Sequence, residues 1–210
     1  MKRLPLFAMI VMIFLVQYLS VAQERPDALK LYREGRYEQA LEVCKIELQE
    51  LPKNMDSYTV MGWTLIALRR YEEAYNKAKE ALSIAPYDHR VLGIAGEALF
   101  FLGKNREALL YFEQYAAIMP TGKRISNVYF FMGEVFIRLG EYNNADIAFS
   151  TALFYEDTDA SWWARLGYSR EMGQDYQWAK EAYENALKLN PNLVEARRGL
   201  ESVSKKLSGG

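Results

Sequence analysis

The sequence predicts an all-α protein made of five stacked helical hairpins. First, an alanine recurs at a nearly fixed period, preceded in four of its five copies by a tyrosine three residues earlier. Second, apolar residues within the copies recur at three- and four-residue spacing, which is typical of amphipathic helices. Third, four of the five copies end in a proline. The alanines, separated by 34, 34, 37 and 34 residues, are Ala40, Ala74, Ala108, Ala145 and Ala179. Such a period indicates units that bury their apolar faces against one another.

The first 22 residues differ from the rest of the chain and predict an export signal. Lys2 and Arg3 precede an apolar run over residues 4–16, and residues 20–22 offer the small side chains that a signal peptidase requires. The competing interpretation is a retained membrane anchor, because residues 4–22 are nearly long enough to span a bilayer. The cleavage site favours removal of the signal. Both interpretations place the repeats outside the cytoplasm.

The second copy shows the hairpin most clearly. Its first helix is predicted from an apolar series at helical spacing: Tyr58, Met61, Gly62, Leu65, Ile66 and Leu68. A charged turn follows at Arg69 and Arg70. A second helix then begins at Tyr71 with Ala74 on its apolar face, and Pro86 ends it because proline cannot continue the backbone hydrogen bonding.

Glycines recur inside the first helices, where each costs about 1 kcal/mol relative to alanine. Their positions are Gly62, Gly96, Gly133 and Gly167. We expect the backbones of two helices to approach closely there.

The other copies depart from this pattern. The first copy has a short first helix over residues 26–34, after the export signal. The third copy has Tyr115 where a small residue is expected, and three extra residues, 123–125, precede the fourth copy. We therefore expect altered packing between the third and fourth copies. The fourth copy has Asp157 in place of its closing proline, and residues 194–210 form a capping helix with a frayed tail.

These copies resemble the tetratricopeptide repeat. The fifth copy matches its motif almost throughout, at Trp163, Leu166, Gly167, Tyr176, Ala179, Tyr183, Ala186 and Pro191. The resemblance implies a right-handed superhelix of about five antiparallel helix-turn-helix repeats plus the capping helix. The repeats would occupy residues 23–54, 55–88, 89–125, 126–159 and 160–193.

Composition and motifs favour binding over catalysis. A net charge of −1 provides no basic field for nucleic acid. Cys44 is the only cysteine, so no internal disulfide or thiolate zinc site is expected, and its inner-face position indicates a small buried hydrophobe. His89 is the only histidine and falls in a turn, and no glycine-rich phosphate loop is present. We therefore expect no catalytic residue, no metal and no cofactor.

The resemblance also implies a binding surface, the concave wall formed by the first helices, where members of the family hold peptides or partner helices. The predicted groove residues are Thr59, Trp63, Glu97, Phe101, Phe130, Glu134, Arg138, Tyr168 and Met172. The acids among them would favour a basic partner, and the aromatic residues would bury its apolar anchors. Some family members clamp a chaperone tail with lysine, asparagine and arginine on this wall, but here Trp63 and Glu97 stand where asparagine-like donors would be needed, so such a receptor is disfavoured. Trp162 and Trp178 lie outside this set and could mark a second contact surface.

The function that follows is an exported or membrane-anchored scaffold that holds a protein or peptide partner, in envelope assembly or transport. An alternative is a carrier of an apolar small molecule or lipid. It is suggested by five phenylalanines in the third and fourth repeats: Phe100, Phe101, Phe130, Phe131 and Phe136.

Overall fold

A computed structural model of the chain describes residues 26–209, and every regular element in that range is a helix. Five hairpins are followed by a single helix. The helices are α2 (Ala28–Arg33), α3 (Tyr37–Glu50), α4 (Met55–Ala67), α5 (Tyr71–Ile84), α6 (His89–Phe101), α7 (Asn105–Ile118), α8 (Ile125–Leu139), α9 (Tyr142–Tyr155), α10 (Ala160–Met172), α11 (Tyr176–Leu189) and α12 (Val194–Ser208). The prediction of an all-α solenoid is confirmed. The proposed export segment, residues 1–22, lies outside the described residues.

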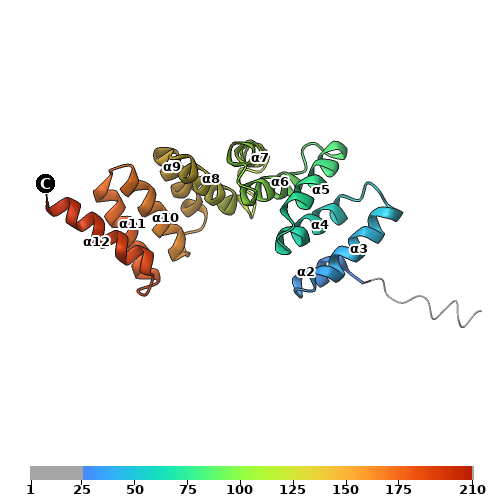
Figure 1. Ribbon diagram of the computed structural model, residues 1–210, viewed down its shortest axis with the longest axis horizontal. Helices are drawn as coiled ribbons and strands as arrows, with labels where there is room; N and C mark the ends of the chain where they lie inside the picture. Colours follow the sequence, from blue (N-terminus) through green and yellow to red (C-terminus); the bar gives the residue numbers. More distant parts are fainter. Residues whose placement is uncertain (1–25, 210) are drawn as a thin grey trace, which may run out of the picture.

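The helices follow one another along an elongated, curved solenoid, with α2 and α3 at one end and α12 at the other (Figure 1). The two helices of each hairpin pack together, and each second helix packs against the first helix of the next hairpin. Helix α12 packs against both α10 and α11, and so covers the last hairpin. Among the helices of residues 26–209, none combines the length and the hydropathy that a membrane crossing requires.

Short polar side chains start four of the five first helices. Asp27, Asn54, Asp88 and Asp159 each accept a hydrogen bond from a backbone N–H in the first turn of the helix that follows. Helix α8 is the exception, because Arg124 of the three-residue insertion precedes it and makes no such bond. The insertion thus replaces a capping residue with an arginine, whose side chain is available for another contact.

Rings from the second helices fill the space over three of the first-helix glycines. A Cβ atom at Gly133 would lie 2.6 Å from the Phe149 ring, and one at Gly167 would lie 2.6 Å from the Tyr183 ring. The Phe112 ring takes the same place over Gly96. Each of these three glycines therefore makes room for a buried ring, whereas a Cβ at Gly62 would lie 2.7 Å from the Ile94 side chain.

The Phe112 ring should make alanine costly at Gly96. A Cβ there would lie 2.5 Å from Phe112, so Gly96→Ala should lower the free energy of unfolding by about 1–3 kcal/mol through overpacking. Gly93, one turn earlier in α6, is the matched control, because its added Cβ would lie 3.5 Å from Tyr115, an ordinary contact. Gly93→Ala should be neutral or gain up to about 1 kcal/mol in helix propensity. Urea denaturation of both variants checks this, and equal losses would contradict it.

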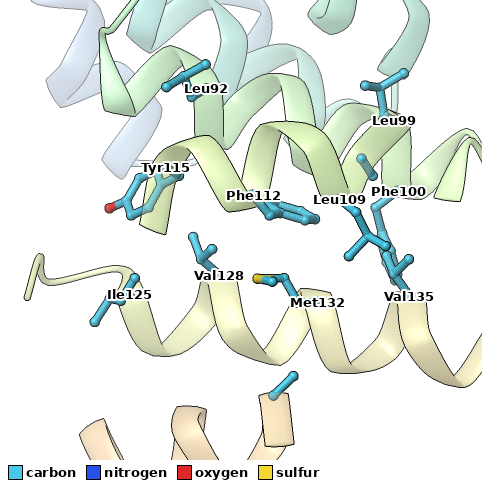
Figure 2. Close-up of a cluster of buried hydrophobic side chains, with 12 residues drawn as sticks. Leu92, Leu99, Phe100, Leu109, Phe112, Tyr115, Ile125, Val128, Met132 and Val135 are labelled. Carbon is cyan, nitrogen blue, oxygen red and sulfur yellow. The ribbon is translucent and has the colours of Figure 1, made fainter. Parts of the chain in front are cut away.

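A core cluster joins the third and fourth hairpins across the insertion. In Figure 2 Val128, Met132 and Val135 point from α8 toward α7, and α7 presents Phe112 and Tyr115 to this layer. The unexpectedly large Tyr115 is 3% exposed and packs beside Gly93. The insertion itself contributes Ile125, which is 2% exposed, to the same core.

Candidate functional site

An open pocket of about 610 Å³ lies beside α8 and α10. Five aromatic residues line it: Phe100, Phe130, Phe131, Tyr168 and Tyr183. Its other lining residues are Glu134, Ser161, Ala164, Arg165, Leu193 and Glu195. The structure therefore brings together three predicted groove residues, Phe130, Glu134 and Tyr168. Pockets of this size and mostly apolar lining are typical of ligand sites.

Glu134, one of the two acids of this pocket, is already paired within the chain. Arg165 donates from Nε to Oε1 of Glu134 and from Nη2 to Oε2 over 2.9 Å, which is a two-pronged ion pair. The Arg165 guanidinium also lies 5.2 Å from the centroid of the Tyr168 ring. The Glu134 side chain is 18% exposed and that of Arg165 is 34% exposed, so a ligand meets the guanidinium more readily than the carboxylate.

A second group of side chains forms around Trp63 and Glu97. The Trp63 ring lies 6.0 Å from that of Tyr32, and the Arg124 guanidinium lies 5.8 Å from the Trp63 ring. Arg124 also donates to the Glu97 carboxylate, which is 12% exposed. The inserted arginine therefore occupies this part of the wall. Since both acids are paired internally, the structure gives no support to the predicted preference for a basic partner.

Two predicted residues have structural roles instead. Thr59 is 2% exposed and donates from its hydroxyl to the carbonyl oxygen of Met55 over 2.8 Å, so it does not lie on an open surface. Arg138 donates to the carbonyl oxygen of Phe100 over 2.7 Å, and its guanidinium stacks 3.7 Å from the Phe100 ring. Arg138 thus ties α8 to the C-terminal end of α6.

The remaining predicted residues lie outside the pocket lining. Phe101 is 44% exposed, and its ring stacks on that of Tyr71 at 4.7 Å. Met172 is 42% exposed at the end of α10. Of the two tryptophans predicted to mark a second surface, Trp162 is buried against Phe130, whereas Trp178 is 59% exposed. Trp178 alone therefore remains available for such a surface.

The buried carboxyl of Glu97 should make stability depend on pH. Burial raises the pKa of Glu97 above its ordinary 4.5, and Arg124 partly opposes this. A carboxyl with a raised folded-state pKa contributes stability that is present below its unfolded pKa and is lost as pH rises through its folded pKa. Glu97→Gln stays neutral, so it should gain stability relative to the wild type as pH rises from about 4 to about 7.

Urea denaturation across that pH range measures the difference. Glu201 is the control, because it is exposed and its hydrogen bond from Lys205 lowers its pKa, so Glu201→Gln should show no such gain in stability as pH rises. A Glu97→Gln profile that runs parallel to that of the wild type would contradict the prediction.

Family models of the tetratricopeptide repeat match residues 56–88 and residues 160–193. Over 95 residues the chain is 32% identical to RNA polymerase II-associated protein 3 of Xenopus tropicalis. That alignment covers 45% of this chain and only 13% of the length of that relative. The two stretches matched by the family models are the second and fifth hairpins, α4–α5 and α10–α11.

Solved structures extend the similarity of fold to most of the chain. MamA from Desulfovibrio magneticus RS-1 superposes with a TM-score of 0.70 at 18% identity, over 80% of this chain and 93% of that one. YrrB, described as a TPR protein with an unusual peptide-binding site, superposes with a TM-score of 0.69 at 18% identity, over 83% of this chain and 88% of that one. The chain is thus an all-helical solenoid that contains tetratricopeptide repeats.

Proposed function

We propose that this protein is a non-enzymatic scaffold that holds a protein or peptide partner in the aromatic pocket beside α8 and α10. The observation that carries the proposal is the open space of about 610 Å³ lined by five aromatic residues. Aromatic side chains around a concave site provide the buried anchor contacts that dominate binding energy in protein interfaces. YrrB, a solved relative of similar fold, is described as having a peptide-binding site, which supports the same class of function.

The pocket fits an apolar or aromatic side chain that projects from the partner. Phe130, Tyr168 and Ala164 provide apolar wall, and the remaining N–H groups of Arg165 can donate to a polar group beside the anchor. Unlike the sequence-based prediction, this proposal includes no preference for a basic group at Glu134 or Glu97, because both are already paired.

Site-specific photo-crosslinking tests the pocket directly. A photoreactive phenylalanine analogue at position 168 should form discrete adducts with one partner in cells, identified by mass spectrometry. The same analogue at Tyr87, which is 77% exposed in the turn before α6, is the control and should not form those adducts. Tyr168→Ala should then weaken binding of the purified partner at least about tenfold, a typical loss for an anchor. The same adducts from both positions would contradict the proposal.

We also propose that the protein acts outside the cytoplasm, in envelope assembly or transport, exported or anchored through residues 4–22. The support is the sequence of this segment, with its charged start, apolar run and cleavage site. Mass spectrometry of the amino terminus separates the two forms. A start at Gln23 means cleavage, and a start at Met1 in the membrane fraction means an anchor. A start at Met1 in the cytosolic fraction would overturn this proposal.

A second candidate function is carriage of an apolar small molecule, which the volume of the pocket favours. Two of the five predicted phenylalanines are partly engaged in packing within the chain, because Phe131 stacks on Phe112 at 5.7 Å and Phe130 stacks on Trp162 at 4.8 Å. Native mass spectrometry of the purified protein should show a bound mass that Tyr168→Ala loses. Spectra of the bare chain alone would reject this function.

A further inference from the structure

The outer face of α9 lacks the charges that usually cover an exposed helix. Ile147 is 66% exposed and Phe154 is 83% exposed. The only charged residue of α9, Asp146, is paired with Arg170 over 2.9 Å. A neutral, apolar strip on a solvent-facing helix is typical of a contact surface rather than of a solvated face.

The other second helices show that this is a property of α9 and not of the fold. Helices α3, α5, α7 and α11 carry five, five, three and four charged residues, against one in α9. All five helices have the same position in their hairpins, so their outer faces are equivalent. The repeat architecture alone therefore does not account for the uncharged face of α9.

This face contains both a projection and a hollow. Phe154 is the most exposed large hydrophobic residue of the described chain. Beside it lies a shallow hollow lined by Asp146, Ile147, Ser150, Thr151, Phe154 and Arg170. Ile147 and Phe154 are about two helical turns apart on the same side of the helix, with Ser150 and Thr151 midway between them.

That spacing makes the face complementary to itself. In a two-fold contact, residue i of one copy meets residue j of the other, and j meets i. An axis that crosses α9 beside Ser150 and Thr151 would place Phe154 of each copy against Ile147 of the other. The face also has no charge to repel its own copy, because the Asp146 carboxylate is neutralised by Arg170.

We propose that the outer face of α9 is a self-association surface, and that its occupant is a second copy of this chain packed antiparallel about a two-fold axis. Trp178 extends the surface onto α11, where its ring lies 5.8 Å from the Arg170 guanidinium. None of Ile147, Phe154 and Trp178 lines the aromatic pocket, so both pockets of the dimer stay open. A partner with two binding segments would then gain avidity. The dimer does not depend on the proposed function of the pocket.

Sedimentation velocity of the full chain, from about 1 to about 200 µM, tests the proposal. The wild type should pass from monomer to dimer within that range, as expected for a contact of modest area. Phe154→Glu and Ile147→Glu should each raise the dissociation constant more than about tenfold, because each buries a charge in an apolar contact. Tyr87→Glu, at another highly exposed aromatic residue, should leave the dissociation constant unchanged.

Disulfide trapping tests the two-fold geometry. Thr151→Cys should form a disulfide-linked dimer on mild oxidation, because a residue beside the two-fold axis lies next to the same residue of the second copy. Asn144→Cys, two turns away and off the axis, should not, and Cys44 is buried. A wild type that stays monomeric at every concentration overturns the proposal. So does a dimer that persists in Phe154→Glu, or equal trapping at positions 144 and 151.

Discussion

Replacing Phe149 with alanine should lower the free energy of unfolding by about 3–5 kcal/mol, the usual cost of removing a fully buried aromatic side chain. Phe149 is 0% exposed, fills the space over Gly133, and lies 5.5 Å from the ring of Phe130. Its loss would leave a cavity between α8 and α9, next to the wall of the aromatic pocket. Urea denaturation followed by circular dichroism measures the effect.

Tyr87→Ala provides the comparison, because Tyr87 is 77% exposed and loses little packing. Its free energy of unfolding should stay within about 0.5 kcal/mol of that of the wild type. Losses of similar size in the two variants would mean that Phe149 is not a packing centre of the solenoid.

Removing Arg165 should also lower the free energy of unfolding. Arg165→Ala leaves the Glu134 carboxylate, 18% exposed, without the guanidinium that donates to both of its oxygens. An unpaired and largely buried carboxylate costs about 1–3 kcal/mol. Because Arg165 itself is 34% exposed, solvent screening should keep the loss toward the lower end of that range.

A second substitution separates loss of the ion pair from loss of packing. Adding Glu134→Gln to Arg165→Ala removes the unpaired charge and should restore part of the stability. Lys205→Ala removes one partner of an exposed ion pair, since Lys205 is 76% and Glu201 68% exposed, and should change nothing measurable. A double variant no more stable than Arg165→Ala would show that the stabilisation does not come from the pair.

The hairpins could be predicted from the sequence because their signals are local. The apolar spacing and the charged turn of the second copy correspond to α4 and α5, and Pro86 follows the end of α5 at Ile84. The final helix, expected from residue 194, begins at Val194. These features depend on residues within a few helical turns of one another, and the same local signals recur in several copies of the repeat.

The candidate site was predicted less well, because its contacts join residues distant in sequence. Arg124 and Glu97 are 27 residues apart, and Arg165 and Glu134 are 31 apart, so no local pattern signals either pairing. Thr59 is expected in the groove because it corresponds to groove positions in the other copies. However, α4, the helix that contains Thr59, is buried on more than one side. The one available clue was that the insertion itself supplies an arginine, Arg124.

The placement of Arg124 has a consequence for how this solenoid unfolds. In an ideal repeat array each unit touches only its neighbours, so stability is a sum of unit and nearest-neighbour terms. Arg124, whose carbonyl oxygen accepts a hydrogen bond from the backbone N–H of Val128 in α8 of the fourth hairpin, contacts Glu97 of the third and lies over Trp63 of the second. This chain therefore contains a coupling between non-adjacent units. Melting should spread across the middle three hairpins as one cooperative step, where a regular array would fray unit by unit.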